Sequence, residues 1–413
     1  MGRNLIVKNI SHIVTPVGSN AVFGKEMAKL KIIENGAIII EEGIIKCVGK
    51  ESEILKNIDE KQYEILDCKG NAVLPGFVDS HTHFIFGGYR EDEFSWRLRG
   101  DSYMSIMERG GGIVNTVNHT REASFDELYN LGKERIDTMI DFGVTTVEGK
   151  SGYGLDLDTE IKQLEVMEKL NNHSDIDVAI TFMGAHATPS EYKGKEEEYV
   201  DFIIKKVLPM VKGKAEFCDV FCEKNVFSIE QSRRILEEGK KLGFKPKLHA
   251  DEIVTLGGSE LSGEVKAISA DHLLQASDKG IEAMRDNKVV STLLPCTAFS
   301  LKESYARGRE MIDKGCAVAL ASDLNPGSCF TNSIPLLIAL STIYMNLSIE
   351  EVITALTLNG AAAIDRAAKI GSIEEGKMGD LIVLKYPSYK FLPYNIGVNQ
   401  VKNVVKGGKV IKR

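Results

Sequence analysis

The middle of the chain alternates short apolar runs with longer segments of helical character, and this alternation restricts the fold more than any other feature. Such a pattern is typical of βα units that build a parallel sheet. Eight apolar runs are expected to be strands, ending near His81, Glu148, His186, Cys222, His249, His272, Pro295 and Asp323. Because eight parallel strands with their helices need about 250 residues plus insertions, we predict an α/β fold with a (β/α)8 TIM-like barrel over residues 77–365.

The two ends of the chain have a different texture, with short β-rich pieces separated by turn residues. These pieces occupy residues 5–10, 36–49, 63–66, 379–384 and 401–411. Glu42-Gly43 lies between two apolar runs and predicts a hairpin turn. We therefore expect residues 1–76 and 366–413 to form together a small β-sandwich domain beside the barrel.

Composition indicates a soluble globular protein, because 43% of the residues are hydrophobic and 27% are charged. The net charge is -8 and the two signs are interspersed, so no basic stripe predicts binding to nucleic acid or to anionic lipid. No signal-peptide pattern opens the chain, and no apolar stretch reaches the about 18 residues that a membrane span needs. We expect a cytoplasmic protein whose seven cysteines, without a CxxC pair, are reduced core residues.

His81-Thr82-His83 follows the first predicted strand. Residues i and i+2 of a strand point to the same side, so the two imidazoles can bind one metal ion. The pair alone also arises by chance on exposed strands. His249 and Asp323, however, end apolar runs of their own, and the carboxyl ends of barrel strands meet at one face. We predict that His81, His83, His249 and Asp323 are metal ligands. The histidines away from strand ends, expected on the surface or in loops, are His12, His119 and His173.

Three imidazoles and one carboxylate suit Zn²⁺ and also Fe²⁺ or Fe³⁺. A water bound at an open coordination position would have a pKa of about 7, so it would supply a hydroxide nucleophile at neutral pH. Glu252 follows His249 by three residues and is the candidate general acid/base. The alternative is a solvated acidic pair with Asp251. His272, at the end of the sixth strand, is expected to orient the hydroxide or to stabilise the developing oxyanion.

The order of these groups resembles the amidohydrolase superfamily: His-x-His on strand one, His-x-x-Glu on strand five, His on strand six and Asp on strand eight. The segments 74–79 and 358–361 are similar to that superfamily too. Within it, the chain closely resembles the imidazolonepropionase family nearly from end to end. The motifs that carry this narrower resemblance are residues 81–90, 150–154, 184–186, 249–252 and 322–328.

This resemblance implies hydrolysis of the cyclic amide 4-imidazolone-5-propanoate to N-formimino-L-glutamate in histidine degradation, by a metal-bound hydroxide with Glu252 as general acid/base. It also implies a small-molecule substrate with a carboxylate tail and a homodimer. The substrate-binding positions that it implies are Arg90, Tyr153, His186, Glu252, Asn325, Gly327 and Ser328. Arg90 would bind the carboxylate, with Tyr103 beside it. Without the resemblance, Arg90 among acidic neighbours fits a surface ion pair as well.

Three alternatives concern the metal and the reaction. Two-metal relatives carry a carboxylated lysine at the end of strand four, where residues 217–223 contain none and Lys224 follows, so we expect one ion. A deaminase of a nucleobase or related cyclic amidine can share the same ligands, and ammonia release would identify it. A scaffold without activity is disfavoured because the full ligand set is present. The run Glu108-Arg109-Gly110-Gly111-Gly112 suits a moving lid or an ordinary loop equally well.

Overall fold

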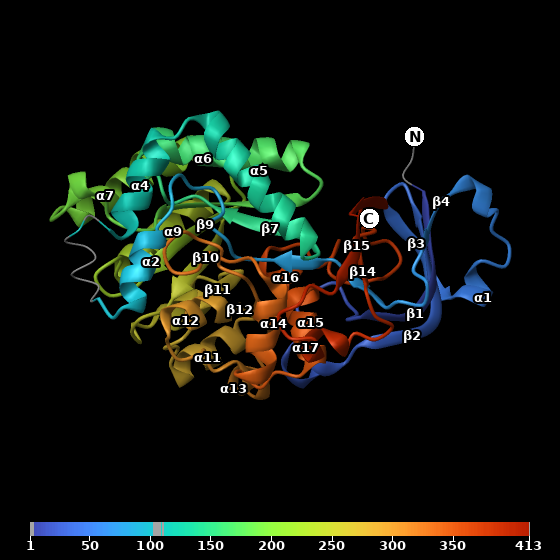
Figure 1. The fold of residues 1–413 in the computed structure, drawn as a ribbon. Helices are drawn as coiled ribbons and strands as arrows, with labels where there is room; N and C mark the ends of the chain where they lie inside the picture. The colour runs from blue at the N-terminus through green and yellow to red at the C-terminus, as the bar shows by residue number, and fades with distance from the viewer. Residues whose placement is uncertain (1–3, 102–108, 110, 413) are drawn as a thin grey trace.

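The computed structural model describes residues 4–101, 109 and 111–412, which form a barrel and a separate mixed sheet (Figure 1). Eight parallel strands follow one another around the barrel in chain order. They are β6 (Phe77–Asp79), β7 (Val144–Lys150), β8 (Asp177–Ala185), β9 (Phe217–Cys222), β10 (Lys245–Ala250), β11 (Ser269–His272), β12 (Val290–Leu293) and β13 (Val318–Leu320). The (β/α)8 barrel predicted from the alternation of apolar runs is confirmed.

The first and last strands approach each other just beyond their carboxyl ends. His81 O accepts a hydrogen bond from Asp323 N at 3.0 Å, and Leu324 O accepts one from His83 N at 2.9 Å. Thr82 and Leu324 form an isolated parallel bridge between these two segments. The first strand is therefore shorter than predicted, because β6 ends at Asp79 and the two histidines lie in the extended segment after it.

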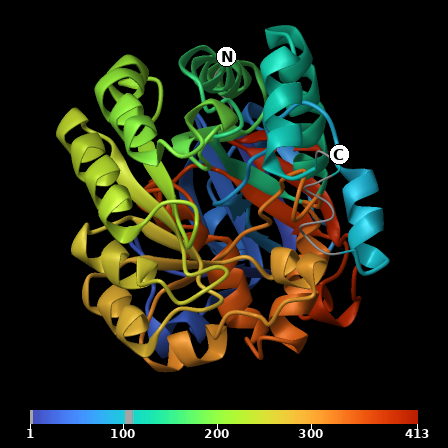
Figure 2. The ribbon, with the colours of Figure 1, turned by 90° about the vertical axis from the view of Figure 1, so that its left-hand side faces the viewer.

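Helices surround the strands in a ring (Figure 2). The helices from the first strand to the fourth are α2 (Glu91–Leu98), α4 (Ile113–Glu122), α5 (Phe125–Asp141), α6 (Leu157–His173), α7 (Glu196–Phe202) and α8 (Leu208–Val211). Those from the fourth strand onward are α9 (Ile229–Leu242), α10 (Gly258–Glu264), α11 (Asp278–Asp286), α12 (Pro295–Leu301), α13 (Gly308–Asp313), α14 (Ile334–Ile343), α15 (Ile349–Leu356) and α16 (Leu358–Ala363). Serine side chains fix several helix starts; Ser228, for example, forms a capping box with Gln231 at the start of α9.

Both ends of the chain contribute to the second sheet, seen at the right of Figure 1. Its strands are β1 (Leu5–Thr15), β2 (Lys31–Glu41), β3 (Ile44–Lys50), β4 (Glu64–Asp67), β5 (Val73–Pro75), β14 (Leu381–Leu384), β15 (Val401–Lys406) and β16 (Lys409–Lys412). The short helices α1 (Glu51–Ile54) and α17 (Phe391–Tyr394) belong to the same two chain ends. The hairpin predicted at Glu42-Gly43 is confirmed, since β2 and β3 pair there in antiparallel register.

The predicted sandwich takes the form of one mixed sheet in which β1 pairs with β2, β4 and β5. The chain passes from this sheet into the barrel at Gly76, between β5 and β6. A Cβ atom at Gly76 would lie 2.3 Å from Thr145 Oγ1, so only glycine fits this crossing. The domain limits at 76/77 and 365/366 stay a prediction.

All seven cysteines are free, and six of them are buried. None of the helices that the structure describes is long and apolar enough to cross a membrane.

Candidate active site at the mouth of the barrel

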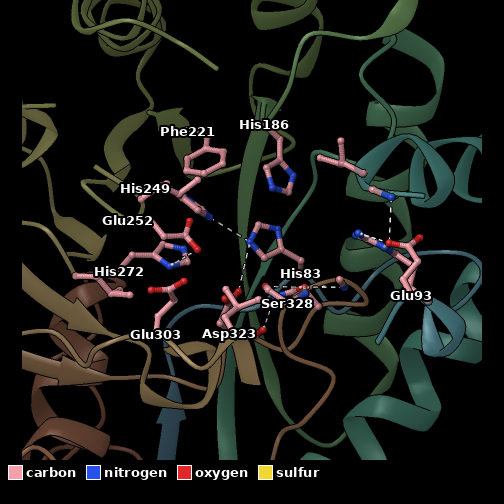
Figure 3. A pocket seen from close by; sticks show the side chains of 18 of the residues that line it. His83, Glu93, His186, Phe221, His249, Glu252, His272, Glu303, Asp323 and Ser328 are labelled. Atoms are coloured by element: carbon pink, nitrogen blue, oxygen red, sulfur yellow. Dashed lines mark hydrogen bonds and ion pairs between the residues drawn. The ribbon is translucent and has the colours of Figure 1, made fainter. Parts of the chain in front are cut away.

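The four side chains predicted as metal ligands converge at the point where the barrel closes. His83 Nε2 lies 3.2 Å from His249 Nε2. Asp323 Oδ1 lies 3.5 Å from His81 Nε2 and 3.9 Å from His83 Nε2. All four side chains are buried, so their donor atoms form one small cluster. Figure 3 shows three of them, His83, His249 and Asp323, at the cavity.

This donor set fits a metal ion. Burial, together with neighbouring Lys150 and imidazole groups, holds the pKa values of His81, His83 and His249 well below the usual value, so these imidazoles are neutral. Two neutral nitrogens that face each other at 3.2 Å suit a shared cation between them. His81 Nε2 is buried and has no hydrogen-bond partner among the described residues. A metal ion would satisfy it.

Asp323 is oriented by a residue that the sequence did not predict. Thr297 Oγ1, in α12, donates a hydrogen bond of 2.6 Å to Asp323 Oδ2. The other carboxylate oxygen therefore remains free to face the histidines. Burial raises the pKa of Asp323 to about 7, which a bound cation would lower again.

Strained backbone accompanies the site. His272 and Asp323 have φ values of 76° and 54°, in a region that non-glycine residues seldom adopt. Asp251, with φ 48°, accepts backbone hydrogen bonds from Leu256, Gly257, Gly258 and Ser259. The alternative that Glu252 and Asp251 form a solvated acidic pair is wrong, because Asp251 is completely buried as the organiser of its loop.

Glu252 lies close to the ligand cluster and beside His272. The distance from Glu252 Oε1 to His272 Nδ1 is 3.5 Å, and the glutamate side chain is only 14% exposed. Burial, and then the nearby Asp323 and Glu223, raise the pKa of Glu252 to about 8. Burial lowers the pKa of His272 to about 4, so this imidazole is neutral at physiological pH. A carboxyl group with a pKa near neutrality can both accept and return a proton.

A cavity of about 580 Å³ opens above these residues. Most of the residues that the sequence marked as a substrate site line it, and so do several that it did not mark. The lining side chains include His83, Arg90, Glu93, Arg97, Tyr153, His186, His249, Glu252, His272, Glu303, Asp323, Asn325 and Ser328.

Two histidines and a tyrosine form one wall. The rings of His83 and His186 stack with centroids 4.9 Å apart, and Tyr153 lies 5.2 Å from His186. Gly152 O is 3.0 Å from His186 Nδ1, which fixes this ring. Burial lowers the pKa of His186 to about 4. A flat, uncharged wall of this kind suits a planar heterocycle.

Arg90 lines the cavity but already has a partner. Its Nε and Nη2 donate to Glu93 Oε2 at 2.9 and 2.7 Å. Its Nη1 faces Gly327, where a Cβ atom would lie 2.1 Å from that nitrogen. Any larger residue at position 327 would therefore displace the guanidinium from this position.

Asn325 shapes the loop that carries Gly327. Its Oδ1 accepts hydrogen bonds from Gly327 N and Ser328 N at 2.9 and 2.8 Å. This side chain thus builds the turn, and Ser328 Oγ lies within 3.1 Å of it.

Arg97, one helical turn after Glu93, was missed. Its Nη2 donates to Gly327 O at 3.2 Å, whereas its Nε is buried without a partner among the described residues. Burial and the neighbouring Arg90 lower its pKa. A sequence signal existed, because Arg90, Glu93 and Arg97 recur at helical spacing on one face of α2.

Tyr103 lies outside the described residues, as do Glu108 and Gly110 of the glycine run, so these predictions stay untested. His119 and His173 lie exposed on α4 and α6, and His12 is partly buried in β1. Lys224 is exposed just after β9.

A layer of charged side chains beneath the ligands was also missed. It contains Glu148, Lys150, Asp219, Lys247 and Asp271, all completely buried. The sequence did contain an indication of this layer. Glu148 and Lys150 are two residues apart in one strand, so both side chains point to the same side, into the barrel.

Fold and site together define a class of protein. A (β/α)8 barrel with three histidines and an aspartate at its mouth is the arrangement of a metal-dependent hydrolase, and residues 235–411 match the amidohydrolase family model. A solved adenosine deaminase from Xanthomonas campestris with bound zinc has the same fold, with a TM-score of 0.71 at 16% identity over 99% of this chain and 93% of that one.

Two curated proteins are far more similar in sequence. Imidazolonepropionase of Clostridium tetani is 63% identical over 99% of this chain and 98% of its own length. Imidazolonepropionase of Parabacteroides distasonis is 59% identical, with 98% of both chains covered. The chain therefore belongs to the imidazolonepropionase family, and it is a metal-dependent hydrolase.

Proposed function

We propose that this chain hydrolyses 4-imidazolone-5-propanoate to N-formimino-L-glutamate in histidine degradation. The observation that carries this proposal is one cavity lined by His83, His249, Asp323, Glu252 and two guanidinium groups, with His81 buried against its floor. The high identity to imidazolonepropionases over nearly the full length supports the same reaction.

His81, His83, His249 and Asp323 would hold one divalent ion, Zn²⁺ or iron. When bound, the ion supplies Lewis acidity and a water of lowered pKa. Support for a single ion comes from the charged layer below. A second group of metal-ligand type, His81, Glu148 and Asp271, already has a cation within it, because Lys150 Nζ lies 3.0 and 3.4 Å from the two carboxylates.

Glu252 would move the proton. It takes one proton from the attacking water and returns it to the ring nitrogen as the amide C–N bond breaks, so the reaction opens the ring and releases no ammonia. A pKa near neutrality suits both halves of this transfer. His272, neutral and 3.5 Å from the carboxylate, would keep Glu252 directed at the reacting atoms.

The carboxylate tail of the substrate would meet two arginines. The charge of Arg90 is already balanced by Glu93, but no carboxylate of the described residues is within ion-pair distance of Arg97. The propionate supplies the missing negative charge, and Arg97 Nε with Arg90 Nη1 provides donors for it. His186, Tyr153, Asn325, Gly327 and Ser328 would complete the substrate site. The cytoplasmic homodimer without nucleic-acid or membrane partners stays the prediction from sequence.

The test is turnover of synthetic 4-imidazolone-5-propanoate, followed by mass spectrometry of the product and an enzymatic assay for ammonia. We expect stoichiometric N-formimino-L-glutamate without ammonia, and no turnover by the His249→Ala variant. Ammonia release from a nucleobase, with no turnover of the imidazolone, would favour the deaminase alternative instead.

A further inference from the structure

The strongest unexplained feature outside the cavity is a lysine that is completely enclosed by acids. Lys150 Nζ donates to Asp219 Oδ2 at 2.7 Å and to Glu148 Oε1 at 3.0 Å, and it lies 3.4 Å from Asp271 Oδ2. Its side chain has no solvent exposure. Burial disfavours its charged form, but Asp219, Glu148 and Asp271 outweigh this effect and raise the pKa of Lys150.

Two of those carboxylate oxygens also face metal-ligand histidines. Asp271 Oδ2 accepts the hydrogen bond of His81 Nδ1 at 2.7 Å. Asp219 Oδ2 lies at ion-pair distance from His249 Nδ1, 3.0 Å away, but the two atoms do not form a hydrogen bond. A proton held on His81 Nδ1 leaves its Nε2 lone pair directed at the ion. The two carboxylates restrict the orientation of the two rings.

The remaining oxygens of both aspartates are held by other groups. Asp271 Oδ1 accepts a hydrogen bond of 2.7 Å from Ser269 Oγ, and Asp219 Oδ1 accepts one of 3.1 Å from the backbone of His249. The carboxylates are therefore fixed on one side by neutral donors and on the other by the ammonium. Removal of the ammonium would leave two ionised aspartates without a cation at hydrogen-bond distance.

We propose that Lys150 is a positioning residue for the metal site, because its ammonium aligns Asp219 and Asp271. Asp271 in turn holds the Nδ1 proton of His81, and Asp219 directs the ring of His249. This inference rests on the metal site of the proposed function. Lys150 contacts no ligand atom itself and acts through the two aspartates.

The barrel offers a matched control in its second buried lysine. Lys247 Nζ donates to Glu148 Oε2 at 2.8 Å and lies near the backbone oxygens of Ser80 and Ala363. Lys247 is as buried as Lys150 and shares Glu148 with it, yet it donates to neither aspartate. Its removal therefore costs the same charge, and some electrostatic support of both aspartates, but no hydrogen bond to either of them.

Paired double variants separate positioning from plain stability. Glu148→Gln/Lys150→Met and Glu148→Gln/Lys247→Met each remove one buried acid and one buried lysine, so both keep the net charge of the layer. They differ only in which ammonium remains. Metal affinity is measured by competition with a chelator, and the Co²⁺-loaded proteins are compared by their visible d–d absorption, which reports ligand geometry.

We expect the Lys150 pair to lose metal affinity by roughly 10- to 100-fold, the range known for loss of a group behind a metal ligand, with an altered Co²⁺ spectrum. The Glu148→Gln/Lys247→Met variant should stay close to wild type in metal affinity and in its Co²⁺ spectrum. Equal losses in the two pairs, or an unchanged Co²⁺ spectrum in the Lys150 pair, would overturn the proposal.

Two further variants keep the proposal testable if the Lys150 pair does not fold. Asp219→Asn and Asp271→Asn retain the shape of the layer but remove the acceptor charge behind one histidine each, so both should weaken Co²⁺ binding. Unchanged Co²⁺ affinity in both would overturn the role of the layer. Failure of the proposed metal site is distinguishable, because wild type would then take up no metal, or His249→Ala would retain it.

Discussion

Replacement of Glu252 by glutamine should stabilise the metal-free protein while it abolishes most of the activity. The carboxyl pKa is raised to about 8 in the fold, against about 4.3 for an unperturbed glutamate. Between these two values the unfolded chain has lost its proton and the folded chain keeps it. Folding stability therefore falls as the pH rises through this window, and the loss is complete above pH 8.

The size of the effect follows from the same two values. At 1.36 kcal/mol per pKa unit, the difference corresponds to at most about 5 kcal/mol, an upper limit because water reaches part of the side chain. Glutamine cannot ionise and escapes this cost. The stability advantage of Glu252→Gln over wild type should thus be small at pH 5 and several kcal/mol at pH 8.5.

Urea unfolding of the metal-free proteins at the two pH values, followed by circular dichroism, measures this difference. Glu303→Gln is the control for the loss of an acid from the same cavity, because Glu303 also lines it but is exposed. In the metal-loaded protein, Glu252→Gln should retain the metal and lower kcat by roughly 10²- to 10⁴-fold. An identical pH dependence of stability in wild type and Glu252→Gln would refute the reasoning about this carboxyl group.

Two further predictions concern the ligands and the substrate tail. His249→Ala should lose both metal and turnover. If elemental analysis finds a full equivalent of metal in this variant and its activity is normal, His249 is not a ligand. Arg90→Ala and Arg97→Ala should each lower kcat/KM steeply, by an amount equivalent to about 2 to 5 kcal/mol, because a buried carboxylate loses a charged partner. An analogue with a neutral amide tail should be poor with wild type and lose little more in either variant; equal losses on both substrates would mean that these arginines support the loop and not the ligand.

Much of the site could be predicted because residues that follow the strands of a (β/α)8 barrel lie together at one end of it. His81, His83, His249 and Asp323 follow strands, and strand ends meet at one face whatever the loops do. The position of Glu252 at the cavity could be predicted for the same reason, because it is a near neighbour of a strand end. The direction of its carboxyl group was not predictable, since it depends on the turn that Asp251 organises.

The parts that were missed depend on contacts between distant segments. Thr297 lies in the first turn of α12, and only the fold brings its hydroxyl to Asp323. Arg97 becomes a candidate for binding the substrate carboxylate because Glu93 already forms an ion pair with Arg90. That pairing depends on how the side chains of α2 pack and cannot be read from the sequence. The role of Lys150 could not be predicted, because a lysine within a buried strand shows no partner until the neighbouring strands are in register.

The measurement that tests the account most directly is titration of the metal-free protein with Zn²⁺ or Fe²⁺, with turnover of 4-imidazolone-5-propanoate as the readout. One ion held by His81, His83, His249 and Asp323 predicts activity that rises linearly and stops rising at one equivalent, with no turnover before metal is added. A rise that continues to two equivalents, or full activity without added metal in protein shown to be metal-free, would contradict the single-ion site.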